Sequence, residues 1–94
     1  MIFLIDDKMM EFRGKLDKID DKILILLIER FNIISLIGKH KKENGIPVVQ
    51  RDRIQEIVDK ARGRAKEHGI KEGSFEKIYR SIIDESCLME EEAE

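Results

Sequence analysis

Residues 8–43 read KMMEFRGKLDKIDDKILILLIERFNIISLIGKHKKE, a run that contains no proline. Apolar residues recur in it at steps of three and four, the spacing of one helix face; they are Leu16, Ile19, Ile23, Leu26/Leu27, Ile33/Ile34 and Ile37. Gly14 and Gly38 weaken a helix by up to about 1 kcal/mol each relative to Ala, which a helix of this length tolerates. The run stops at Asn44-Gly45, before Ile46-Pro47. We expect one helix of roughly 50 Å, at about 1.5 Å per residue.

Two shorter helices follow. The first is expected from Val49 or Gln50 to about His68, where Gly69 supplies a left-handed cap; its inner face is Ile54, Ile57, Val58, Ala61 and Ala65. The second is expected from Gly73 or Ser74 to Glu91, with Ser74 as its cap; its inner side is Phe75, Ile78, Tyr79, Ile82, Ile83 and Cys87, with Ser86 or Glu90. The pattern predicts an all-α fold of three helices, one long and two shorter.

The chain is short for so long a helix. Its 94 residues make a single domain, residues 1–94, in which we expect 1–8 and 91–94 to fray, and Met9 or Met10 is a candidate start. A compact chain of this size has a radius of gyration near 13 Å, too small to cover a rod of roughly 50 Å. We therefore predict an intertwined helical homodimer.

Composition excludes several classes of function. Charged residues make up 40% of the chain but the net charge is only −2, so no general nucleic-acid binder is indicated. The lone Cys87 rules out an internal disulfide framework and a multi-cysteine zinc site, and the histidines lack metal spacing. The apolar runs Met1–Ile5 and Ile23–Ile28 are far shorter than a membrane span of about 20 residues. No basic region precedes the first run, so we do not expect a secretory signal. We expect a cytoplasmic protein without metal or membrane contact.

Two cations interrupt the apolar face of the long helix. Arg30 lies seven residues after Ile23 and four before Ile34, so it points inward, and Lys41 follows eleven residues later on the same face. Both side chains could extend to solvent or pair with acids at a helix edge. An inward guanidinium needs an anionic partner, however, and a bound anion is one candidate.

A third cation suggests a shared site. Arg13 precedes Arg30 by 17 residues, about 25 Å, so one small ligand cannot touch both from one chain. If two long helices pair antiparallel, Arg13 of one chain can approach Arg30 and Lys41 of the other. Arg53 can add a fourth cation, or belong to a solvated first turn. With no nucleophile–base pair and no glycine-rich phosphate loop, the pattern favours a small polyanion, a dicarboxylate or phosphate, and no cofactor.

Five segments carry a resemblance to a known family. They are Phe12-Arg13-x-Lys-Leu-Asp-x-Ile-Asp-Asp-Lys-Ile, Leu27-Ile-Glu-Arg30, Ile37-Gly38-Lys39-His40-Lys41, Ile46-Pro47-Val48 and Ile82-Ile83-Asp84-Glu85-Ser86. In this order, over about residues 10–90, they resemble the all-helical (AroQ) class of chorismate mutases. The resemblance implies an intertwined homodimer with two active sites, each built from both chains. It also implies the Claisen rearrangement of chorismate to prephenate, in the shared route to Phe and Tyr, without metal or cofactor.

The resemblance also implies roles for individual residues. Arg30 would bind one substrate carboxylate and the partner's Arg13 another, while Arg53 and Ser86 complete these contacts. Lys41 would contact a carboxylate and the ether oxygen of the breaking C–O bond. Glu90 falls where the family has Gln or Glu facing that oxygen. Because only the protonated acid donates a hydrogen bond, we expect activity to fall as pH rises, unless Glu90 belongs to the solvated acidic tail.

Two positions depart from the family pattern. Gln50 and Ile54 stand where many members have an acid followed four residues later by Glu, which binds the ring hydroxyl of chorismate. Ile54 cannot make this contact, although a backbone amide near Gln50 can contribute. Isochorismate-pyruvate lyases share the fold and are the alternative within it. A non-catalytic regulatory helical module, with its cations paired internally, is the alternative of another class.

Overall fold

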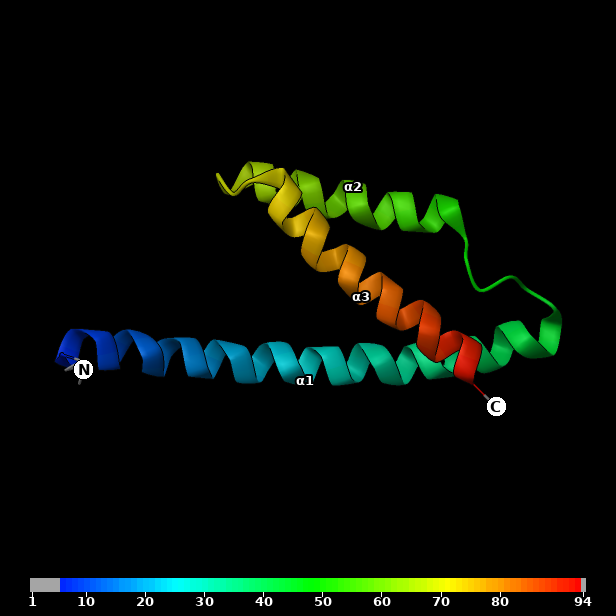
Figure 1. The fold of residues 1–94 in the computed structure, drawn as a ribbon, viewed down its shortest axis with the longest axis horizontal. Coiled ribbons are helices and arrows are strands. Elements are labelled where there is room, and N and C mark those ends of the chain that lie inside the picture. The colour runs from blue at the N-terminus through cyan, green and yellow to red at the C-terminus, as the bar shows by residue number, and fades with distance from the viewer. Residues whose placement is uncertain (1–5, 94) are drawn as a thin grey trace, which may run out of the picture. The chain divides into compact units, whose positions relative to one another are not determined.

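The computed structural model describes residues 6–93 and consists of three helices, α1 (Asp7–Asn44), α2 (Arg51–Glu67) and α3 (Glu72–Glu92), with no strand in that range (Figure 1). The prediction of an all-α fold with one long and two shorter helices is confirmed. The chain divides into two compact units, Met1–Asn32 and Ile33–Glu94, and each is described by itself. The first contains only α1, whereas the second combines the end of α1 with α2 and α3.

The ends of the described chain are more regular than expected. Asp7 and Lys8, which we predicted to fray, form the first turn of α1. The carboxylate of Asp6 accepts a hydrogen bond from the backbone N–H of Met9 at 2.8 Å and so caps that turn. Residues 91 and 92 complete the last turn of α3, and the fraying expected at both ends stays a prediction. Residues 1–5 and 94, included in the same prediction, lie outside the described residues.

Glycine ends two helices as predicted. Gly45 and Gly69 adopt φ values of 63° and 67°, the left-handed conformation that glycine tolerates best. The backbone N–H of the next residue then donates back into the last helical turn, from Ile46 to the Lys41 carbonyl and from Ile70 to the Ala65 carbonyl, both at 2.9 Å. These hydrogen bonds give a donor to carbonyl groups of the last helical turn that would otherwise lack one.

The α2–α3 pair has a small apolar core, and Figure 1 shows the two helices joined by a tight turn. Val58, Ala61 and Ala65 of α2 and Ile83 of α3 are buried, which confirms the centre of both predicted inner faces. Ile78, by contrast, is 56% exposed, so that part of the predicted face is not covered within this chain.

The start of α3 corrects a second prediction. The helix begins at Glu72 with Lys71 as its N-cap residue, and no side chain caps it. Ser74, predicted to be the cap, lies inside the first turn, where its N–H donates to the Lys71 carbonyl at 3.0 Å. The earlier start places the Glu72 carboxylate at the positive end of the helix dipole and 2.9 Å from Arg62 of α2.

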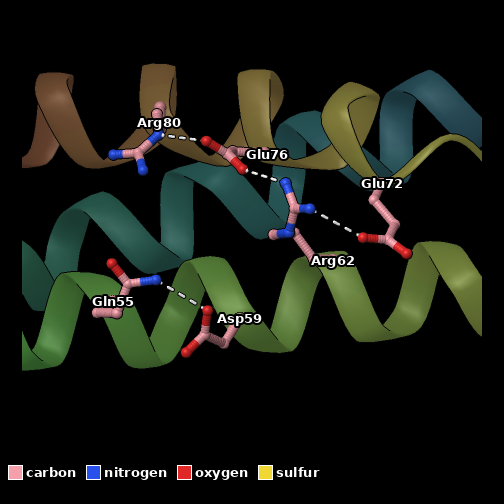
Figure 2. Close-up of polar contacts among 6 residues, drawn as sticks. All are labelled: Gln55, Asp59, Arg62, Glu72, Glu76 and Arg80. Atoms are coloured by element: carbon pink, nitrogen blue, oxygen red, sulfur yellow. Dashed lines mark hydrogen bonds and ion pairs between the residues drawn. The ribbon is translucent and has the colours of Figure 1, made fainter.

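Ion pairs join α2 to α3 beside this core (Figure 2). Arg62 of α2 reaches Glu72 at 2.9 Å and Glu76 at 2.6 Å, both on α3. Arg80, one turn further along α3, donates to Glu76 at 2.9 Å. All four side chains are at least a quarter exposed, so the surrounding water weakens each pair.

Candidate active site

Lys41 and Glu90 form a buried ion pair near the end of α1. The ammonium nitrogen Nζ of Lys41 lies 2.5 Å from Oε1 of Glu90 on α3, and the two side chains are only 12% and 6% exposed. The same nitrogen donates to the backbone carbonyl of Val48, in the segment between α1 and α2, at 2.9 Å. An ammonium has three N–H donors, and these two contacts, made within residues 6–93, leave one for a ligand.

The burial of Glu90 decides between two interpretations of the C-terminal segment. Its side chain is enclosed against Lys41 rather than solvated with the acidic residues that follow, so the solvated-tail alternative is wrong. Helical spacing places Ser86 one turn earlier on the same side of α3. Ser86 is also buried, and its Oγ donates to the Ile82 carbonyl at 2.7 Å. Two predicted site residues, Glu90 and Lys41, are therefore in direct contact, with Ser86 beside one of them.

The predicted residues of α2 are arranged differently. Gln50 is the N-cap residue of α2, and its side chain makes no capping hydrogen bond. Arg53 donates to Glu56 at 2.9 Å, with both side chains well exposed. An exposed Arg53 at the start of α2 is compatible with the solvated first turn that was the alternative for this residue. The position of Arg53 at a substrate therefore stays a prediction.

Arg13 and Arg30 belong to the first unit. Arg13 is exposed and Arg30 is half-buried, both within α1. Their predicted place beside Lys41, one of them from a second chain, stays a prediction.

An apolar pocket of about 410 Å³ opens between the start of α2 and α3. It is lined by Val49, Ile54, Arg80, Ile83, Asp84, Cys87 and Leu88. The charges of Glu90 and Lys41 both act on Cys87, which lines the pocket, so the pocket lies near the buried pair. Burial raises the pKa of the Cys87 thiol, and the Glu90 carboxylate raises it further, so Cys87 is a packed residue rather than a reactive thiolate.

Comparison with known proteins identifies the family. The family model described as chorismate mutase type II matches residues 12–91, nearly the whole chain. The chain belongs to the type II chorismate mutase family. Its relatives include a chorismate mutase of Methanocaldococcus jannaschii, 33% identical over 92% of this chain and 87% of that protein. A 4-amino-4-deoxychorismate mutase of Streptomyces venezuelae is 28% identical over 90% of this chain and 82% of that protein. A solved structure, a conserved hypothetical protein from Pyrococcus furiosus, is 31% identical with a TM-score of 0.76, covering 92% of this chain and 99% of that one.

Two contributors to the site of this family member were not anticipated from the sequence. The Val48 carbonyl orients Lys41, and a backbone acceptor has no signature in a sequence. Gly38, interpreted from the sequence as a weak point of the helix and as part of the family resemblance, is buried against Glu90. The available signal was a glycine inside a helix one turn before an inward cation.

Residues 6–93 contain neither a metal-binding cluster nor a membrane-spanning helix. No cluster of three or more His, Cys, Asp or Glu side chains there is arranged to hold a metal ion. No helix in the same range is both long and apolar enough to span a bilayer.

Proposed function

We propose that this member of the type II chorismate mutase family converts chorismate to prephenate. The observation that carries the proposal is the Lys41 ammonium, held by Glu90 and Val48 in a nearly enclosed position with one N–H unused. In this rearrangement the ether C–O bond breaks while a C–C bond forms within the same molecule. The reaction needs a restrained conformer and donors at the oxygen that gains negative charge, not a nucleophile or cofactor.

The remaining groups hold the substrate dianion. Arg30 binds one carboxylate and the partner's Arg13 the other, and a bidentate guanidinium suits a carboxylate geometrically; Gln50, Arg53 and Ser86 complete the binding contacts. Lys41 donates to the ether oxygen, and Glu90 donates to the same oxygen when it carries its proton. Because the Lys41 ammonium is already held in place, little reorganisation is needed at the moment of reaction.

The homodimer is part of the same proposal and rests on α1. Leu24, Ile25 and Leu26 follow one another and so point about 100° apart around the helix, yet they are 58%, 57% and 61% exposed in the single chain. A helix that is apolar around its circumference is normally buried on all sides. A second copy wrapped around α1 would cover these side chains and would supply Arg13. The cytoplasmic location stays a prediction, which the single cysteine of the chain suits.

A second substrate has its own support. The Streptomyces relatives act, by name, on 4-amino-4-deoxychorismate, which carries an amine where chorismate has a ring hydroxyl. The half-buried Ile54 lines the apolar pocket at the position where the family resemblance implies recognition of that ring group. An apolar wall discriminates weakly between a hydroxyl and an amine, because neither group finds a hydrogen-bond partner there. Turnover of both substrates is therefore an expected property of this site.

Product analysis tests the proposal. The purified protein is mixed separately with chorismate, 4-amino-4-deoxychorismate and isochorismate, and the products are identified by chromatography. Prephenate from chorismate supports the proposal, whereas rearrangement of only the amino compound would move the assignment to the second substrate. Salicylate and pyruvate from isochorismate, with little prephenate, would indicate the lyase. No turnover of any of them would leave a helical module whose Lys41–Glu90 pair is structural.

A mixing experiment tests the shared site. Arg13→Ala and Lys41→Ala are each expected to be nearly inactive, but a hybrid dimer places both substitutions in one site and leaves the other intact. Equal amounts, unfolded together and refolded, form about half hybrid dimers and so recover about a quarter of the wild-type activity. The same variants refolded separately are the control. No recovery on mixing would contradict an Arg13 supplied by the partner.

A further inference from the structure

Gly38 lies inside α1, where glycine is unfavourable relative to alanine, so a packing reason is needed. The structure supplies one. A Cβ placed on Gly38 would lie 2.8 Å from Cα of Glu90, 3.0 Å from the Glu90 carbonyl oxygen and 2.8 Å from Cβ of Ala93. Two of these atoms are backbone and cannot turn away. The end of α3 therefore rests directly on the backbone of α1, and any side chain at this position would force the helices apart.

The residue whose backbone touches Gly38 is also the partner of Lys41. Gly38 precedes Lys41 by three residues, so both lie on the same side of α1. The backbone contact of Gly38 with Glu90 and the ion pair of Lys41 with Glu90 are thus neighbouring contacts between the same two helices. The Lys42 ammonium adds an exposed tie to the Ala93 carbonyl at 3.3 Å. The separation of the helices at Gly38 sets how far the Glu90 carboxylate reaches toward the Lys41 ammonium.

We propose that Gly38 is a positioning residue that acts through Glu90, holding its carboxylate and the Lys41 ammonium together at the reacting ether oxygen. This role rests on the proposed chorismate mutase function. Displacing a group by about 1 Å in an active site can cost on the order of 100-fold in rate. Gly38→Ala is accordingly expected to lower kcat by about 10- to 100-fold. The effect on KM is smaller, because other cations bind the substrate carboxylates.

The chain contains a matched control for this substitution. Gly63 lies inside α2, and an added Cβ there meets nothing within 4 Å. Gly63→Ala makes the same chemical change in a helix without the close approach, and kcat is expected to stay within about twofold of wild type. Equal losses of kcat in the two variants would overturn the positioning role, because crowding against Glu90 would then not be the cause.

A double-mutant cycle separates action through Glu90 from a general packing effect. If Gly38 acts through Glu90, adding Gly38→Ala to Glu90→Ala lowers kcat by no more than about twofold further. If the fold-loss in kcat of the double variant equals the product of the fold-losses of the two single variants, the proposal is contradicted. A Glu90→Ala variant with wild-type kcat would also contradict it. Thermal unfolding confirms that each variant is folded at the assay temperature. If Gly38→Ala does not fold, Ala93→Val crowds the same contact from the end of α3 and takes its place in the cycle.

The experiment also distinguishes this proposal from the function on which it rests. A wild type that turns over no chorismate counts against the proposed function, whereas an active wild type with an equally active Gly38→Ala counts against the positioning role. One readout needs no substrate: the buried ammonium of Lys41 is expected to give a slowly exchanging ¹⁵N–¹H signal in NMR. Gly38→Ala should lose or shift that signal while Gly63→Ala keeps it, and retention in both would overturn the proposal.

Discussion

Two groups of ion pairs in the second unit differ in burial and in what they join. Lys41 and Glu90 are 12% and 6% exposed and make one close contact between the end of α1 and α3. The set of Arg62, Glu72, Glu76 and Arg80 is 25% to 50% exposed and joins α2 to α3 along their surface (Figure 2). A surface ion pair adds little to the stability of a protein, and breaking it costs little. A buried ion pair is costly to desolvate, and removal of one partner strongly destabilises the protein because the other charge is left buried and unpaired.

The difference indicates a difference in role. The surface set can lose a member while the apolar core of α2 and α3 remains intact. A buried pair that is expensive to desolvate is poor evidence for a stabilising role, but it does keep an ammonium in a fixed, nearly dry position. Within the proposed function that position is what transition-state stabilisation requires.

The largest effect is expected at Lys41. Lys41→Ala removes a donor from the ether oxygen and is expected to lower kcat by about 100- to 1000-fold, on the order of 3 to 4 kcal/mol in barrier. Steady-state kinetics with chorismate measures the loss, with the exposed Lys60→Ala as control. The same variant leaves the Glu90 carboxylate buried without its counter-ion, so Lys41→Ala/Glu90→Ala should unfold at a higher temperature than Lys41→Ala alone. A Lys41→Ala enzyme with wild-type kcat would remove the contrast.

The second effect concerns the side chain at position 90. Glu90→Gln keeps the size of the side chain and carries an amide N–H that can donate to the ether oxygen, whereas Glu90→Ala has no donor and leaves Lys41 without its partner. Glu90→Gln is therefore expected to have a higher kcat than Glu90→Ala. Steady-state kinetics of the two variants with chorismate measures the difference, and equal rates would show that position 90 does not donate to the reacting oxygen.

The third effect is a modest loss of stability at Arg62. Arg62→Ala removes the two ion pairs that Arg62 makes with Glu72 and Glu76 of α3. It is expected to lower the thermal unfolding midpoint slightly while kcat stays near the wild-type value. Arg64→Ala is the matched control, because among the described residues Arg64 pairs with Glu67 of its own helix, at 3.4 Å, and with no residue of α3. A loss of kcat in Arg62→Ala comparable with that of Lys41→Ala would erase the distinction between the two groups of pairs.

The smallest effect is an acid-dependent one at Glu76. Hydrogen bonds from Arg80 and then Arg62 hold the pKa of Glu76 below its ordinary value near 4.5. A group whose pKa is lower in the folded state stabilises the fold above its unfolded pKa and loses that contribution as pH falls through the folded one. Denaturant unfolding followed from neutral pH to below pH 4 should show this loss, and Glu76→Gln should lack this part of it. An identical pH dependence in both proteins would contradict the assignment.

Three residues of the candidate site could be placed from the sequence because they lie on helix faces, and their roles at a substrate stay predictions. Lys41, Ser86 and Glu90 were chosen from their spacing and from the family resemblance, and the structure buries or half-buries all three. Gly38 was interpreted as a weak helix position and as part of the family resemblance, and nothing local to it indicates that α3 approaches there. Arg53 pairs with Glu56 in the described chain, a partner that the sequence did not single out, and its place at the substrate stays a prediction. Local spacing predicts which way a side chain points, but not what stands opposite it.

The sequence alone determined that there are three helices and where α1 and α2 end. Steps of three and four between apolar residues bury one face, and Gly45 and Gly69 end helices because only glycine adopts a positive φ without strain. The tertiary structure decided which residues of different helices are in contact. Lys41 and Glu90, 49 residues apart, are in contact, and Gly38 is covered by the backbone of α3. Those contacts depend on how closely two helices approach, which is set by the packing of all their side chains together and cannot be read from either helix by itself.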